Sequence, residues 1–330
     1  MAHDRIIQPK SRSSRNWSID RLLSRVRFGD RVFSNITLVF ALLVVATLVG
    51  MIVILNIDAM PSIRKFGGSF LGSTAWNAVS GNFGALPAMF GTLLTSFIAL
   101  VIAVPISIGA AVFLAELAPP WIRGPASFLV EMLAAIPSVI IGLWGLIVMV
   151  PYLAVPEKWL ARNVGFVPFF RGPVFGGVSF LAAGIILAIM IVPIIAAVSR
   201  DAIRSVPQSQ KEAMLALGAT RWETIRKAVI PYCRSGLIGG TILGLGRAMG
   251  ETMAVTMVIG NKYWITPSLV SPGTTVASKI AAEFAEADTA LLLSSLVELA
   301  LVLFGVTLVV NVIARVLVWR LTAVKAEGAG

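Results

Sequence analysis

The stretch VPQSQKEAMLALGATRWETIRK, residues 206–227, is a charged segment enclosed by two long apolar runs. Pro207 offers a helix start, and Glu212 falls in the first turn, where the helix dipole favours an acidic side chain. Gly218 would end this helix as a C-cap, and a second helix is expected from near Thr220. The stretch therefore predicts a helix–glycine–helix hairpin outside a membrane, with an apolar tip suited to a groove on a partner.

The composition around this stretch is that of a membrane protein. Of the 330 residues, 57% are hydrophobic and only 13% are charged, too few charges for the surface of a soluble domain of this length. Because lipid leaves no water for unpaired backbone groups, we expect an all-α, polytopic fold. It has about six transmembrane helices, over residues 36–57, 88–115, 127–155, 176–199, 235–260 and 290–318.

Prolines lie inside three of these segments, at Pro105, Pro137 and Pro193. Proline removes a backbone donor and kinks a helix, which a membrane tolerates where neighbouring helices satisfy the freed carbonyl groups. Two interpretations stay open. The helices are bent because they line a cavity, or proline is simply frequent in membrane helices.

Lys and Arg are distributed unevenly between the two sides that these segments define. Nineteen of the 27 lie in residues 1–35, in residues 200–234, at Arg123 and in the C-terminal segment. Seven lie in the opposite connections, and Arg247 lies inside an apolar segment. Because Lys and Arg accumulate on the cytoplasmic side, we expect both termini and residues 200–234 in the cytoplasm.

Three regions follow from this pattern. Residues 1–35 are expected to form a cytoplasmic tail, disordered over residues 1–15. A short amphipathic helix in the headgroup region is expected next, from the helical spacing of Ile19, Leu22, Leu23 and Val26. Residues 36–320 form the transmembrane permease domain, with a coupling segment at about 200–231. Residues 321–330 form a cytoplasmic C-terminal tail.

Several function classes are excluded by what the sequence contains. Cys233 is the one cysteine and His3 the one histidine, which removes Cys/His nucleophilic pairs and histidine zinc sites. No G-x-x-x-x-G-K-[ST] phosphate loop is present, so the chain does not hydrolyse ATP itself. We expect no catalytic residue, no metal and no cofactor in this chain. The net charge is +11, but the basic residues lie between apolar runs, which indicates contact with membrane lipids and not with nucleic acid.

Arg247 lies at membrane depth in the fifth segment, and Glu251 follows four residues later on the same helix face. A charge at this depth is costly unless it is paired or hydrated. The planar fork of an arginine matches the oxygens of phosphate, so an anion pathway has a reason to hold one here. One alternative is that the two charges only neutralise each other, and another is that Glu251 holds Arg247 until an anion competes for it. Nearby glycines at 236, 239, 240, 244, 246 and 250 suit a helix at a subunit interface.

Glu131 and Glu298 also fall inside apolar segments. They are candidates for intramembrane gating, or for a partner of Arg247. An equally acceptable interpretation is a carboxyl group that is protonated or bonded to a helix backbone.

The hairpin resembles the cytoplasmic loop of bacterial ABC importer permeases. Four residues fall on that family's pattern, namely Glu212, Ala213, Gly218 and Pro231, while Met214, Ala228 and Ile230 are apolar departures from it. The resemblance implies a type I importer permease whose coupling helix, with Glu212, Ala213, Met214 and Gly218, docks on a separate ATPase. ATP and Mg would be used by that ATPase.

Three further stretches are similar to the C-type permease family of the phosphate-specific importer, at residues 76–87, 131–139 and 246–261. This resemblance implies phosphate import across the bacterial plasma (inner) membrane. It also implies a heterodimer with a homologous A-type permease, an ATPase subunit dimer and an extracytoplasmic phosphate-binding protein.

Two alternatives remain. One is an ABC permease for another oxyanion or a polar solute, which would keep the coupling segment. The other is a secondary transporter of the inverted-repeat type, for which no convincing repeat between the two halves is found.

Overall fold

The computed structural model describes residues 16–323, with the side chains of residues 32–316. The expected disorder of residues 1–15, and most of the expected C-terminal tail, lie outside this range. The chain divides into two compact units, one ending at Ile54 and one beginning at Leu55. Among the described residues, six helical spans are long and apolar enough to cross a membrane, as the sequence predicts. They are Val32–Phe66, Leu86–Leu117, Ser138–Asn163, Phe180–Arg204, Arg221–Met249 and Ala290–Val316.

The first unit consists of most of helix α1 (Asn16–Phe66). This helix has no break, so residues 19–26, expected as a separate interfacial helix, form its first turns. Their predicted place at a membrane surface stays a prediction, because their side chains lie outside the described set. From Val32 to Ile54 the helix exposes large apolar side chains, as a lipid-facing helix does.

The second unit is built on α3 (Leu86–Val112) and α7 (Phe180–Arg204), which pack along each other. Small side chains of α3 such as Ala99 and Ala103 lie in one buried cluster with large side chains of α7, including Ile186 and Ile191. Such alternation of small and large residues allows close packing of two helices. Pro105 and Pro193 lie inside these two helices without ending them.

The third apolar segment differs from the expected single helix over 127–155. A helix α4 (Pro120–Ala134) ends before Pro137, and α5 (Ser138–Trp144) begins directly after it. Proline cannot donate a hydrogen bond and moves the preceding residue out of the α region, so Pro137 ends one helix instead of bending it. The new helix continues through η2 (Gly145–Met149) and α6 (Val150–Asn163).

The fifth segment is also divided. The helix α10 (Ile230–Met249) ends just before residues 250–252, and a short helix α11 (Met253–Val258) follows. A loop then leads to α12 (Val276–Glu283), η5 (Phe284–Glu286) and α13 (Ala290–Ala323).

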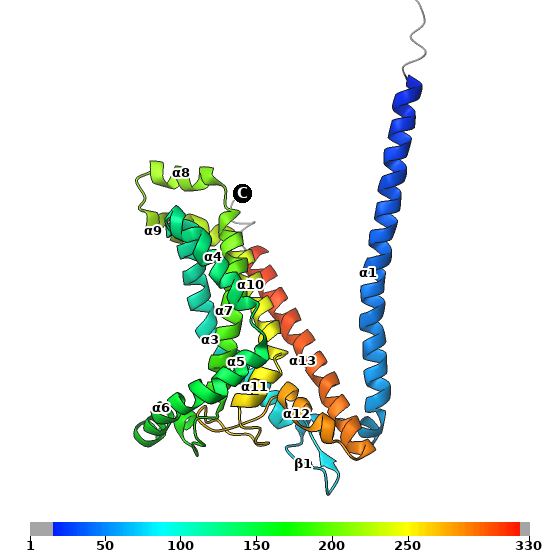
Figure 1. Cartoon of the computed structure of the whole chain (residues 1–330), viewed down its shortest axis with the longest axis vertical. Coiled ribbons are helices and arrows are strands. Elements are labelled where there is room, and N and C mark those ends of the chain that lie inside the picture. Colours follow the sequence, from blue (N-terminus) through cyan, green and yellow to red (C-terminus); the bar gives the residue numbers. More distant parts are fainter. Residues whose placement is uncertain (1–15, 324–330) are drawn as a thin grey trace, which may run out of the picture. The chain divides into compact units, whose positions relative to one another are not determined.

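The remaining elements lie at the two ends of the second unit. One end carries α8 (Gln208–Ala216) and α9 (Arg221–Thr224), which leads through η4 (Ile225–Val229) into α10 (Figure 1). The opposite end carries α6, α12 and a hairpin of β1 (Trp76–Asn77) and β2 (Asn82–Phe83), paired antiparallel. Short helices α2 (Ser69–Gly72), η1 (Phe113–Leu117) and η3 (Pro168–Phe170) complete the fold. The predicted hairpin therefore lies at the end of the second unit opposite to α6, α12 and the β hairpin (Figure 1).

Candidate coupling and transport sites

The predicted helix–glycine–helix hairpin is present, but Glu212 is the fifth residue of α8 and lies beyond the first turn, in which the sequence predicts it. Helix α8 ends in a Schellman motif, in which Gly218 N donates to Leu215 O and Ala219 N to Met214 O. Gly218 has φ +83°, a left-handed conformation that glycine adopts without a steric penalty. Thr220 and Glu223 then form a capping box that starts α9.

The four predicted coupling residues lie together on this hairpin. Glu212 and Ala213 are exposed on α8, Met214 is half-buried, and Gly218 is exposed at the turn. Beside them the tip exposes Leu217 over 85% of its surface. Trp222 of α9 is exposed as well, so the hairpin presents several apolar side chains to solvent, and such a group suits contact with another protein.

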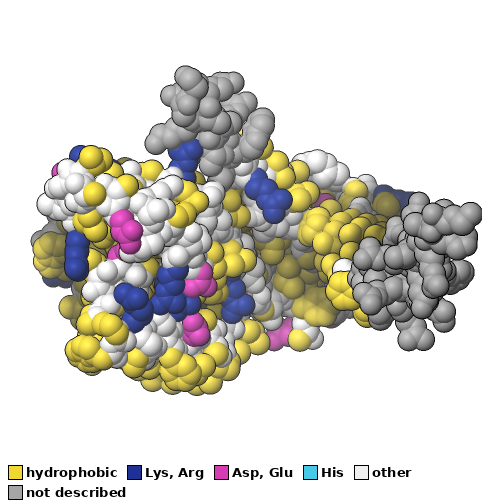
Figure 2. All heavy atoms as spheres, turned by 90° about the horizontal axis from the view of Figure 1, so that it is seen from above, with side chains coloured by type: hydrophobic (Ala, Val, Ile, Leu, Met, Phe, Trp, Pro, Cys, Tyr) yellow, Lys and Arg dark blue, Asp and Glu magenta, His cyan; other side chains and the backbone are white. Residues whose placement is uncertain are grey.

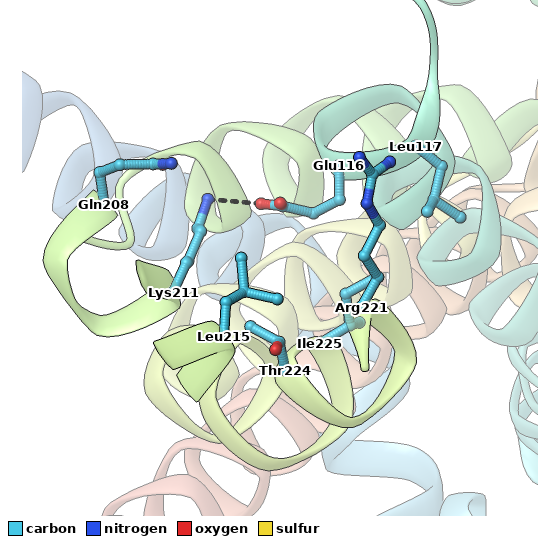
Figure 3. A pocket seen from close by; sticks show the side chains of 8 residues that line it. All are labelled: Glu116, Leu117, Gln208, Lys211, Leu215, Arg221, Thr224 and Ile225. Carbon is cyan, nitrogen blue, oxygen red and sulfur yellow. Dashed lines mark hydrogen bonds and ion pairs between the residues drawn. The ribbon is translucent and has the colours of Figure 1, made fainter. Parts of the chain in front are cut away.

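A small cavity of about 200 Å³ lies between α8, the start of α9 and η1 (Figure 3). Across it, Lys211 Nζ of α8 donates to Glu116 Oε1 of η1 over 2.5 Å, and both side chains are largely buried. Leu215, Thr224 and Ile225 line the wall below the pair. Sequence reasoning missed this ion pair, because its two residues are 95 positions apart.

Many charges gather at this end of the unit. Figure 2, which views the end that carries α8 and α9, shows Lys and Arg side chains next to Asp and Glu on its face. Residues 200–234 alone contribute seven basic side chains. A surface of this kind belongs in water and not in lipid.

Arg247 and Glu251 are brought together as predicted, but α10 ends between them. Arg247 Nη2 lies 3.6 Å from Glu251 Oε2. Glu251 Oε1 accepts a hydrogen bond from Ala254 N at the start of α11, and only 5% of the Glu251 side chain is exposed, against 49% of the Arg247 side chain. The carboxylate thus contacts the backbone at the start of α11 over 3.4 Å, while the guanidinium group makes one long ionic contact and keeps donors for another anion.

The glycines of α10 have two different surroundings. A Cβ on Gly236 would lie 2.4 Å from Ala202 Cβ, and one on Gly244 would lie 2.6 Å from Ile195 Cγ1. These two glycines therefore allow α7 to pack closely against α10. Gly239 and Gly246 meet no atom within 4 Å. The role at a subunit interface therefore stays a prediction for Gly239 and Gly246, whereas Gly236 and Gly244 serve packing within the chain.

One interpretation of the sequence makes Glu131 a partner of Arg247. The structure pairs Glu131 with Arg200 instead. Arg200 Nη2 donates to Glu131 Oε1 over 3.0 Å, and Arg200 Nε donates to Asp201 Oδ1 over 3.0 Å. The arginine comes from α7 and the glutamate from α4. The sequence predicts that the fourth apolar segment ends at residue 199, which places Arg200 in the loop that follows. In the structure α7 continues for five more residues, to Arg204, so Arg200 belongs to the helix.

Glu298, the other gating candidate, is buried on α13, with 6% of the residue exposed. Its Oε2 has no hydrogen-bond partner within the part of the chain that the structure describes. Ser62 and Ser295 form a buried hydrogen bond of 3.0 Å between α1 and α13. A gating role of Glu298 stays a prediction.

The end opposite α8 is held by a cluster that sequence reasoning also missed. Lys279 of α12 forms an ion pair with Glu283. Its Nζ lies 5.0 Å from the ring centroid of Trp76 and 4.9 Å from that of Tyr263. Trp76 Nε1 donates to Glu283 Oε2 over 2.7 Å, and the hydroxyl group of Tyr263 donates to the carbonyl group of Gly84. Burial, and then the nearby Glu283 carboxylate, raise the pKa of Tyr263. The cluster connects β1, α12 and the loop before it.

Among the residues that the structure describes, no three His, Cys, Asp or Glu side chains gather as a metal site would require.

Comparisons with known proteins add what geometry alone does not give. A family model described as the binding-protein-dependent transport system inner membrane component matches residues 103–323. The phosphate transport system permease protein PstC of Haemophilus influenzae is 47% identical over 303 residues, which is 90% of this chain and 96% of that protein. PstC of Mesorhizobium japonicum is 44% identical over 96% of both chains.

The fold also has a solved counterpart. A bacterial ABC transporter involved in the import of the acidic polysaccharide alginate aligns with a TM-score of 0.54 at 18% identity, over 88% of this chain and 99% of that one. At this identity the similarity concerns the fold alone.

Proposed function

Since the chain belongs to the binding-protein-dependent transport system inner membrane components, and among them to the PstC-type phosphate permeases, we propose that it conducts phosphate past Arg247 under the control of α8. It is a multi-pass membrane protein and a permease subunit of a phosphate importer of the ABC type. The assignment of phosphate as the substrate rests on the sequence identity of 44–47% to phosphate permeases over at least 90% of the chain.

Arg247 is proposed as the substrate contact because its guanidinium group is half exposed and loosely paired. Phosphate offers oxygens that the arginine fork binds in a bidentate manner. Glu251, which contacts the backbone at the start of α11, competes with the anion for the same group. Such competition lets phosphate bind and leave again, as conduction requires.

The exposed tip of α8 is proposed to receive movement from an ATPase. Glu212, Ala213, Met214 and Gly218 form the contact, and the Lys211–Glu116 ion pair transmits it to α3. The proposed assembly contains an A-type permease, an ATPase dimer that uses ATP and Mg, and an extracytoplasmic phosphate-binding protein. The chain lies in the bacterial plasma membrane among lipids, with α8 and both termini in the cytoplasm.

Uptake of phosphate against sulfate, by the complete importer in proteoliposomes, tests this proposal. We expect ATP-dependent phosphate uptake that Arg247→Ala reduces at least about tenfold. A preference for sulfate would favour a permease for another oxyanion. Uptake by this chain without an ATPase would favour a secondary transporter. Co-purification should yield a second permease and an ATPase with this chain.

A further inference from the structure

The Arg200–Glu131–Asp201 cluster lies outside the Arg247 site, on the side toward α8. The guanidinium group of Arg200 is buried, with 8% of its side chain exposed, whereas 53% of Glu131 and 65% of Asp201 remain exposed. The two carboxylates outnumber the guanidinium group, so the cluster carries a formal net charge of −1 and presents its negative groups outward.

These exposed carboxylates cannot face lipid. A charge in the hydrocarbon core is costly unless it meets water or a partner charge. Around Glu131, α4 exposes large apolar side chains at Phe128, Leu129 and Met132, which suit lipid or another subunit. Glu131 therefore lies on a face of α4 that borders water or polar groups of a neighbouring subunit.

The depth of the cluster relative to Arg247 follows from the packing of α7 on α10. Gly236 of α10 abuts Ala202 and Gly240 abuts Val198, so Arg200 lies level with the stretch between these glycines. Arg247 lies about nine residues further along α10, which corresponds to about 14 Å at 1.5 Å per residue. An anion that moves from Arg247 toward the α8 end therefore passes the height of Arg200 along α10.

Helix α4 has the properties of a movable carrier for Glu131. None of its residues is buried within this chain. Residues 118–119 before it and 135–137 after it are not helical, and prolines stand in both breaks. A shift of α4 would separate Glu131 from Arg200 without unfolding either helix.

We propose that this cluster is a charge gate for phosphate on the α8 side of Arg247. With α4 in place, the outward carboxylates repel anions, and Arg200 is occupied. When α4 moves, Arg200 is released from Glu131 and becomes a second binding group for phosphate before it is discharged. The inference rests on the proposed phosphate pathway and adds its inner barrier.

Efflux from loaded vesicles tests the gate without ATP. The complete importer is reconstituted with phosphate and glucose inside, and both are followed as they leave. Glu131→Gln keeps the shape of the side chain but removes its charge, so phosphate efflux should rise roughly tenfold while glucose stays inside. Asp201→Asn leaves the Arg200–Glu131 bond intact and should raise phosphate efflux in the same direction. Glu286→Gln, at an exposed carboxylate of η5, should match the wild type.

Charge selectivity is the outcome that a purely structural ion pair would not produce. If both variants retain phosphate as the wild type does, or lose phosphate and glucose alike, the gate does not exist. Should Glu131→Gln fail to assemble, Asp201→Asn decides the matter alone. ATP-driven phosphate uptake by the wild type in the same kind of vesicles tests the proposed function separately. Failure of the proposed function is therefore distinguishable from failure of the gate.

Discussion

Lys211 of α8 donates to Glu116 of η1 over 2.5 Å, and both side chains are largely buried. Helix α8 is the proposed contact for the ATPase, and η1 continues α3, which packs along α7 in the core. A displacement of α8 therefore acts on the transmembrane core through a side-chain contact as well as through the chain.

Breaking this ion pair should loosen α8. Lys211→Met leaves the Glu116 carboxylate buried without a partner, which costs on the order of 3 kcal/mol in local stability. We expect faster hydrogen exchange of the α8 amides in the purified importer and a lower rate of ATP-driven phosphate uptake. Lys227→Met is a matched control, because its exposed pair with Glu223 contributes little. Exchange that is unchanged by Lys211→Met would show that the pair does not hold α8.

Gly218 should tolerate few other residues, for a backbone reason. A Cβ at this position meets no atom within 4 Å, so a side chain would find space in this chain, but φ is +83°. A β-branched residue in that conformation costs about 1–2 kcal/mol or more. Gly218→Val should therefore disrupt the turn after α8 and uncouple the importer, with ATP hydrolysis retained and phosphate uptake reduced.

Asparagine provides the control for that substitution, since it adopts left-handed conformations more readily than valine does. Gly218→Asn should keep most of the uptake that Gly218→Val loses. Equal loss in both variants would point to a contact of the turn with the ATPase that admits no side chain at all.

Arg247 should depend on its fork and not only on its charge. Arg247→Lys keeps a positive charge but loses bidentate geometry, so its uptake rate at saturating phosphate should fall several-fold, between those of the wild type and Arg247→Ala. Uptake is measured in proteoliposomes with equal amounts of importer. Wild-type rates in Arg247→Lys would mean that charge alone suffices.

The features that the sequence predicts correctly depend on neighbouring residues. The hairpin around Gly218 follows from caps and a turn within a few positions, and the approach of Arg247 to Glu251 follows from a spacing of four. The six spans follow from length and hydropathy. Each of these signals is complete within one segment, so it can be interpreted before the chain is folded.

The features that escaped prediction depend on contacts between distant segments. Glu131 and Arg200 are 69 positions apart, and Lys211 and Glu116 are 95 positions apart. No local pattern relates such residues. At Pro137 the sequence predicts a bend, whereas the structure has a break between two helices. Proline can bend a helix or end it, and the packing of the surrounding helices decides which.

Tyr263 should stabilise the end opposite α8 through its hydroxyl group. Tyr263→Phe leaves the carbonyl group of Gly84 without this donor, at a cost of about 1–3 kcal/mol. The unfolding temperature of the purified importer should fall by a few degrees. Tyr152→Phe, at a side chain that is 78% exposed, should leave it unchanged. A similar shift in both variants would place the effect outside this hydrogen bond.

Gly91 should be the least replaceable glycine of α3. A Cβ there would lie 1.8 Å from Thr274 O and 3.1 Å from the ring of Phe180, so alanine forces apart the loop before α12, α3 and α7. This region also holds the hydrogen bond from Val276 N to Thr92 Oγ1, which the shift would weaken. Gly91→Ala should therefore destabilise the protein by several kcal/mol and reduce the amount of importer recovered from membranes. Gly109→Ala in the same helix meets no atom within 4 Å, and since alanine favours a helix over glycine by about 0.5–1 kcal/mol, its yield should equal or exceed that of the wild type. Equal recovery of both variants would mean that the loop yields to the added methyl group, and that the close contact of Gly91 with Thr274 contributes little to the fold.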